Sequence, residues 1–102
     1  MTRPSIQQLE KHIHACAQDT AHIIFATHTR QRMLQRRIND LMVLDTLRKG
    51  IITWEPEPDP RSDGLRCVME RYVARVQVGV VVLVDYPQPD LTIITVMAVT
   101  RI

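Results

Sequence analysis

The spacing of apolar residues changes at Gly50, and this change restricts the possible folds more than any other feature of the sequence. Before Gly50 the apolar residues recur at helical intervals, whereas after it they form short, valine-rich runs separated by turns. The connections after residue 75 are too short for a crossover helix, so neighbouring strands are expected to pair antiparallel. The pattern therefore predicts an α+β fold in which N-terminal helices pack on a four-stranded antiparallel meander sheet.

The apolar pattern and the residues that start and stop helices predict seven elements. Helices are expected at residues 6–18, 28–37 and 39–49, and strands at residues 51–54, 65–74, 77–85 and 91–99. Ser5 opens a capping box, Asn39 is a good N-cap, and Gly50 is a typical C′ glycine. Residues 22–26 fit either an edge strand or a lead-in that inserts Phe25 into the core.

The composition of the strands indicates how the sheet is covered. Residues 77–85 resemble a central strand with both faces covered, and the second cover is expected to be the first helix or a partner protein. Prolines at alternate positions in residues 55–60 are expected to exclude ladder pairing there and to leave the segment exposed. Trp54 is expected to anchor the core, whereas the places of Tyr72 and Tyr86 stay open.

The length and the charge distribution favour a single domain with a local basic patch. A chain of 102 residues fits one domain over residues 1–102. The net charge is only +2, but the charges are unevenly placed. Residues 28–37 contain four arginines and no acid, whereas residues 55–63 contain four acids and one arginine. A basic patch is therefore favoured over a protein that is basic on all sides.

The basic stretch has the spacing of one helix face. His28, Arg32 and Arg36 recur every four residues, so on a helix they lie along one side. Guanidinium groups bind phosphate well, and an imidazole can take up or release a proton near neutral pH. This stretch is therefore the candidate site for binding and chemistry on a phosphodiester.

The same stretch contains a family motif. The chain matches the pattern His-Ala-x-x-Arg-Met-x-x-Arg-x-Ile, followed by Val, Leu and Gly, at His28, Arg32, Met33, Arg36, Ile38, Val43, Leu47 and Gly50. In this motif it resembles a domain-of-unknown-function family of small bacterial proteins in the RelE-like fold group, which includes RelE-type and BrnT-type toxin ribonucleases. The likeness covers about residues 22–100 and leaves residues 1–21 as an extra N-terminal helix. Thr29 and Arg37 stand where that family usually has alanine and glycine.

The resemblance implies a RelE-like or barnase-like fold and a metal-independent endoribonuclease of the toxin–antitoxin type, or a descendant of one. In such enzymes the RNA 2′-hydroxyl attacks the adjacent phosphate. His28 would be the acid or base, and Arg32 and Arg66 would be further catalytic residues that stabilise the transition state. RNA contacts would come from Arg30, Arg36, Arg71 and Tyr72. The implied partners are RNA and a neutralising antitoxin protein.

Two other interpretations of the same residues remain open. A non-catalytic module would use the basic helix and the sheet to bind a protein or a nucleic acid. A structural remnant would only pair its arginines with neighbouring acids such as Asp40, Asp45 and Glu70. In the second case His28 would simply cap the second helix. A homodimer is compatible with each interpretation.

The histidines, cysteines and apolar runs indicate neither a metal site nor a membrane protein. His12 and Cys16 share a helix face while His14 points elsewhere, and two ligands do not make a zinc site. No metal and no cofactor are therefore expected. Cys16 and Cys67 are interpreted as reduced core thiols of a cytoplasmic protein. The N-terminus lacks the pattern of a secretion signal, and the apolar run at residues 78–84 is too short to cross a membrane.

Overall fold

Three helices precede most of the sheet in the part of the chain that the computed structural model describes, residues 3–99. The helices are α1 (Ile6–Cys16), α2 (Thr29–Arg36) and α3 (Asp40–Lys49), with a short 3-10 helix, η1 (Thr20–His22). The strands are β1 (Ile23–Phe25), β2 (Ile51–Ile52), β3 (Glu57–Pro58), β4 (Leu65–Val73), β5 (Val76–Val84) and β6 (Leu91–Ala98). The predicted α+β class is confirmed.

Within residues 3–99 the sheet contains six strands rather than the four predicted. The order is β1-β6-β5-β4-β2, and β3 pairs with the other end of β4. The pairings among β2, β3, β4, β5 and β6 are antiparallel. β1 adds a short parallel pairing, with Ile23 opposite Leu91 of β6. The edge-strand alternative for residues 22–26 is therefore the one the structure adopts.

The proline-rich segment pairs with β4, although its prolines were expected to exclude ladder pairing. Glu57 pairs with Arg66, and Pro58 pairs with Leu65, at the start of β4. A proline is tolerated on an edge strand, because its missing N–H can be the group that faces solvent. The alternate spacing of the prolines leaves the amide of Glu57 free to pair. The prediction that residues 55–60 make no ladder contact is therefore wrong.

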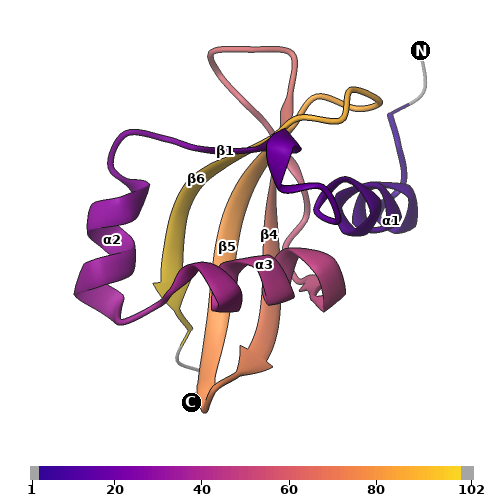
Figure 1. The fold of residues 1–102 in the computed structure, drawn as a ribbon. Helices are drawn as coiled ribbons and strands as arrows, with labels where there is room; N and C mark the ends of the chain where they lie inside the picture. The colour runs from indigo at the N-terminus through magenta and orange to yellow at the C-terminus, as the bar shows by residue number, and fades with distance from the viewer. Residues whose placement is uncertain (1–2, 100–102) are drawn as a thin grey trace.

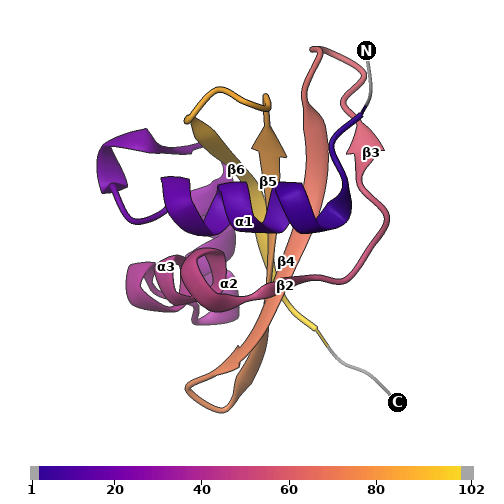
Figure 2. The ribbon, with the colours of Figure 1, turned by 90° about the vertical axis from the view of Figure 1, so that its right-hand side faces the viewer.

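All three helices lie on one face of the sheet, and no described helix covers the other face (Figures 1 and 2). We call the uncovered side of β4, β5 and β6 the open face. Along β4, Cys67 and Met69 are buried toward the helices, whereas Tyr72 is 67% exposed on the open face. The expectation that the first helix covers the second face is therefore wrong, whereas a partner protein on the open face stays a prediction. A valine-rich strand does not need a second covering layer, because neighbouring strands of the sheet already shield part of each side chain. Val81, for example, is half-buried on the open face.

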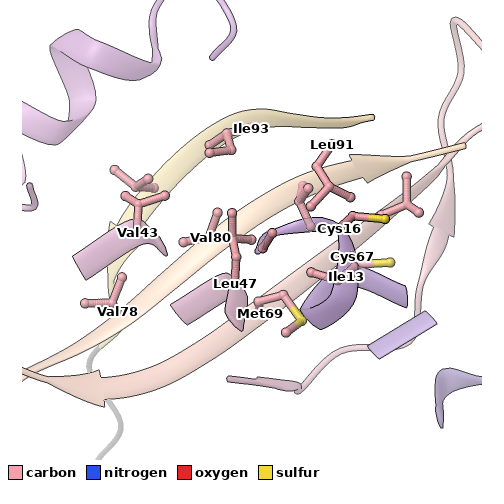
Figure 3. Packing of buried hydrophobic residues seen from close by; sticks show 14 of the residues in the cluster. Ile13, Cys16, Val43, Leu47, Cys67, Met69, Val78, Val80, Leu91 and Ile93 are labelled. Carbon is pink, nitrogen blue, oxygen red and sulfur yellow. The ribbon is translucent and has the colours of Figure 1, made fainter. Parts of the chain in front are cut away.

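The core lies between the helices and the sheet (Figure 3). Ile13 of α1 and Leu47 of α3 belong to the same buried cluster as Met69, Val80 and Ile93 of the three long strands. All five side chains are fully buried. Burial of a side chain of this size stabilises the fold by roughly 1.5–3 kcal/mol. The apolar residues that recur at helical spacing and those of the strands therefore pack together in one core.

The predicted helix caps are present, but Gly50 acts differently from a C′ glycine. Ser5 and Asn39 cap α1 and α3 through their side chains. Gly50 follows Lys49 with φ −74°, which is not the left-handed conformation. A Cβ at Gly50 would lie 2.8 Å from the carbonyl oxygen of Glu70. Glycine is therefore suited to this position because α3 ends close against the backbone of β4.

Trp54 is more exposed than expected, and Tyr86 contacts α1. Trp54 is 61% exposed, so the prediction that it anchors the core is wrong. The physical reason is that β2 ends at Ile52, which leaves Trp54 outside the sheet. Tyr86 follows β5 and lies edge-on against the ring of His12, with the ring centres 5.0 Å apart. The aromatic contact therefore joins α1 to the β5–β6 loop rather than filling the core.

Two leucines of α3 provide a matched test of this packing. Leu47 is fully buried, whereas Leu41 is 76% exposed. Leu47→Ala should lower the free energy of unfolding by about 2–5 kcal/mol, because it removes buried contacts and leaves a cavity. Leu41→Ala should change it by no more than about 0.5 kcal/mol. Urea unfolding followed by circular dichroism measures both, and equal losses would contradict the proposed core.

Candidate nucleic-acid interface

Helix α2 is attached to β6 by a buried threonine. Oγ1 of Thr29 lies 2.8 Å from the carbonyl oxygen of Ile93 and 3.0 Å from that of Ile94. The N–H of Ala26, just before α2, donates to the same Ile93 oxygen at 3.0 Å. Thr29 and Met33 form the buried face of α2, and the rest of the helix is exposed. Helix α2 therefore lies against the β6 end of the sheet with most of its surface in solvent.

The spacing predicted for the basic stretch is present in α2. His28 occupies the N-cap position, and its carbonyl accepts a hydrogen bond from the N–H of Arg32 at 3.2 Å. Arg36 follows one turn later, and all three side chains are exposed. His28 is thus the N-cap residue of α2, as the structural interpretation expected, although its imidazole makes no capping hydrogen bond. We call His28, Arg32 and Arg36 the α2 basic flank.

The α2 basic flank lies on the side of the helix away from α3. The guanidinium of Arg30 is 3.9 Å from the ring centre of Phe25 and forms an ion pair with Asp40 of α3. Arg30 therefore faces the helix layer. Successive residues of a helix are rotated by about 100°, so Arg32 lies on the opposite side of the buried face from Arg30. The α2 basic flank thus faces outward, beside β6.

The positive charges of the α2 basic flank are not neutralised within residues 3–99. No described carboxylate lies within 4.0 Å of the guanidinium of Arg32 or Arg36, whereas Arg30 has Asp40. Arg32 donates instead to the side-chain oxygen of Gln35 at 3.5 Å. Arg37 adds a further exposed charge directly after α2. These guanidinium groups are therefore available to an anionic ligand.

Arg37 ends α2 in a left-handed turn. It is the C-terminal cap of α2 and has φ 56°, the left-handed conformation in which glycine is common. In this chain the turn carries an arginine, which extends the basic surface to the end of α2.

The other arginines of the expected site do not join the α2 basic flank. Arg66 and Arg71 are five residues apart on β4, so their side chains project to opposite faces of the sheet. Arg71 lies toward the helices, where it pairs with Asp45 of α3 at 2.6 Å. Arg66 donates to Asp59 at 2.9 Å. Arg66 and Arg71 therefore do not share one face of the sheet, and each already contacts an aspartate.

The open face holds a second polar group that the sequence analysis did not assign to the site. Glu70 is 1% exposed, accepts a hydrogen bond from the hydroxyl of Thr53, and is 3.3 Å from Nε2 of Gln77. Tyr72, directly opposite Gln77 in the register, is exposed beside this group. A glutamate in the middle of a predicted strand is the signal that could have pointed to this group, because buried carboxylates are uncommon unless they are hydrogen-bonded.

The histidines of α1 serve as structural contacts. Nε2 of His12 lies 2.8 Å from the carbonyl oxygen of Gln88 and 3.5 Å from Sγ of Cys16. His14 points elsewhere, as expected, and its Nε2 lies 2.7 Å from the carbonyl oxygen of Gly50. Residues 3–99 contain no group of three or more potential metal ligands, and none of their helices is long and apolar enough to span a membrane.

Both cysteines are free and buried. Burial raises the pKa of the Cys67 thiol to about 11, and burial together with the nearby charge of Asp90 raises the pKa of the Cys16 thiol. Both thiols are therefore protonated at neutral pH, whereas a nucleophilic cysteine needs its thiolate form. The expected core positions of Cys16 and Cys67 are confirmed.

The ion pair of Arg66 predicts a specific pH dependence. Hydrogen bonds from Ser62, Arg66 and the backbone of Arg61 hold the pKa of Asp59 below its ordinary value. A carboxylate with a lowered pKa stabilises the fold above about pH 4, and this stabilisation is lost as the pH falls through the lower folded-state value. Asp59→Asn should therefore lower stability at pH 7 and flatten its decline between about pH 5 and pH 2.

Asp63→Asn is the control for this prediction, because Asp63 lies in the same loop and has no described cation within 4.0 Å. Urea unfolding at a series of pH values should show the wild-type profile for Asp63→Asn and the flattened profile for Asp59→Asn. Identical profiles for all three proteins would contradict the role assigned to Asp59.

One comparison with known proteins identifies a family. The family model described as Domain of unknown function (DUF4258) matches residues 25–98. The match runs from the end of β1 to the end of β6 and leaves α1 outside. No curated protein and no solved structure matches the chain. The predicted membership of a domain-of-unknown-function family is confirmed, and the chain belongs to the family of DUF4258 domains.

Proposed function

We propose that this chain acts on RNA as a metal-independent endoribonuclease of the toxin–antitoxin type, or as a descendant of one, with the α2 basic flank as its RNA-binding surface. One observation supports the proposal above all others. Arg32 and Arg36 are exposed on successive turns after His28, and no described carboxylate lies within 4.0 Å of either guanidinium. An arginine pair free of acids suits a phosphate backbone, whereas an ion-paired surface would not.

The chemistry available to this surface is a transfer of the phosphate within the RNA. The 2′-oxygen forms a bond to the adjacent phosphorus, and the bond from phosphorus to the 5′-oxygen breaks, which leaves a 2′,3′-cyclic phosphate and a 5′-hydroxyl. The imidazole of His28 can take the proton of the 2′-hydroxyl or give one to the leaving oxygen. Arg32, one turn away, can stabilise the negative charge on the phosphate oxygens.

The remaining candidate residues differ in whether they can contact the RNA. Arg36 extends the phosphate contacts along α2. Arg66 and Tyr72 lie on β4, which is separated from β6 by β5. They can reach the RNA only if the RNA chain continues from α2 over the open face. Arg30, Arg66 and Arg71 are each bound to an aspartate, so we do not include these three arginines among the RNA contacts that support the proposal. The RelE-like fold and a neutralising antitoxin partner belong to the same proposal and rest on the motif resemblance.

A second candidate function is a non-catalytic module that binds RNA or a protein through α2. The observation that favours it is the separation of the groups: His28 and Arg32 lie on α2, whereas Arg66 lies on β4 and already binds Asp59. Cleavage needs several groups around one phosphate, but binding needs only the free arginines. The two functions differ in whether the RNA is cut.

The test combines cleavage and binding of one fluorescein-labelled single-stranded RNA by the purified chain. Under the proposal the RNA is cut in the presence of EDTA, the product carries a cyclic phosphate, and His28→Ala or Arg32→Ala lowers the rate by on the order of a hundredfold. Arg32→Ala should also weaken binding measured by fluorescence anisotropy. Arg61→Ala, which removes an exposed arginine of the acidic loop, is the matched charge control and should change neither quantity.

The outcomes separate the two functions. Binding that depends on Arg32 without any cleavage would support the binding module and contradict the nuclease. Binding that is equally strong in Arg32→Ala and in the wild type would contradict both, because the α2 basic flank would then not contact the RNA.

A further inference from the structure

The exposed face of α2 carries a second stripe of polar side chains beside the α2 basic flank. Gln31 and Gln35 are four residues apart, and both are exposed. Because successive residues of a helix are rotated by about 100°, Gln31 lies directly opposite the buried face formed by Thr29 and Met33. Gln35 lies between Gln31 and Arg32 around the helix. We call Gln31 and Gln35 the α2 amide stripe.

The composition of α2 differs from that of the other two α-helices described. Helix α1 contains Glu10, and α3 contains Asp40 and Asp45, so each carries charges of both signs. Of the three, only α2 has no acidic residue, and its exposed polar side chains are all guanidinium or amide groups. A phosphate chain that lies along α2 therefore meets no repulsive charge from the helix itself.

The two amides of the stripe are available to a ligand. The side chain of Gln31 has no hydrogen-bond partner among residues 3–99. The side-chain oxygen of Gln35 accepts from Nη1 of Arg32 at 3.5 Å, and its amide nitrogen has no partner among the same residues. Each amide can therefore offer a ligand a donor next to an acceptor.

We infer that Gln31 and Gln35 read adenine bases of a single-stranded RNA whose phosphates lie on the α2 basic flank. Adenine presents a donor next to an acceptor on both of its hydrogen-bonding edges, the N6 amino group with N7 and the same group with N1, and a glutamine amide matches this pair. Guanine presents two acceptors, O6 and N7, which suit arginine instead. This base reading rests on the proposed RNA binding by α2 and adds which bases the RNA must contain.

The bases must be unpaired for this contact. The major groove of a double-stranded RNA helix is deep and narrow, so side chains cannot reach the base edges there, whereas unpaired bases expose both edges. Residues four apart on a helix are about 6 Å apart along its axis. Arg32 with Arg36, and Gln31 with Gln35, therefore offer two phosphate contacts and two base contacts that run side by side along α2.

Fluorescence anisotropy of the full chain with three short fluorescein-labelled RNAs tests this assignment. One RNA contains only uridine, and the others have two adjacent adenines or two adjacent guanines at the centre. All 2′-oxygens are methylated, so binding is measured without cleavage. The wild type should bind the adenine RNA at least about fivefold more tightly than either other RNA, because a bidentate contact discriminates by roughly that factor or more. Duplexes of the same sequences should show no such preference.

The variants Gln31→Ala and Gln35→Ala should each reduce the adenine preference, and the double variant should bind the three RNAs with equal affinity. Gln31 does not contact Arg32, so its single variant separates base reading from any effect on that arginine. Gln7→Ala removes an exposed amide from α1 and is the matched control, which should keep the full preference. All three positions are exposed, and circular dichroism checks that the variants are folded.

The outcomes distinguish this assignment from the RNA binding on which it rests. Equal affinity of the wild type for the three RNAs, or an adenine preference that survives in the double variant, would overturn the base reading and leave the proposed binding intact. Tighter binding of the guanine RNA would overturn it in favour of reading by arginine. If Arg32→Ala binds the adenine RNA as tightly as the wild type does, the RNA does not lie on the α2 basic flank, and both proposals fail.

Discussion

The hydroxyl of Thr29 makes the contact on which the position of the whole basic surface depends. It is completely buried and lies within hydrogen-bond distance of two consecutive carbonyl oxygens of β6, those of Ile93 and Ile94. The β5–β6 register shifts between Val81 and Val82, opposite this part of β6. A bulge leaves backbone groups without a ladder partner, and a side chain can then satisfy them. Thr29 therefore orients α2, and the orientation of α2 decides where Arg32 faces.

The sequence predicted the elements whose signal lies within a few neighbouring residues. The helix caps at Ser5 and Asn39, the three long strands and the change of period at Gly50 are all local patterns, and they appear in the structure. The sequence left β1 as one of two alternatives and excluded β3; these strands are three and two residues long and pair along β6 and β4. Their pairing is a tertiary contact, which periodicity within one segment cannot reveal.

The candidate site likewise contains a part that local sequence patterns predict and a part that only tertiary contacts determine. The spacing of His28, Arg32 and Arg36 was visible in the sequence because a helix has a fixed period. The positions of Arg66 and Arg71 relative to α2 were not visible, because they depend on which face of β4 each residue occupies and on acids from distant segments. Asp59 and Asp45 hold the two guanidinium groups on opposite sides of the sheet. The nuclease proposal therefore rests on α2 and not on a pocket that joins α2 to β4.

The most direct test of this account is amide hydrogen exchange in Thr29→Val, with Thr29→Ser as the matched variant that keeps the hydroxyl. The account predicts that Thr29→Val speeds the exchange of the α2 amides, because the helix loses its attachment to β6, while the central pairing of β4 and β5 exchanges as before. Thr29→Ser should keep α2 close to the wild-type protection. Unchanged protection of α2 in Thr29→Val would contradict the claim that this hydroxyl positions the basic surface.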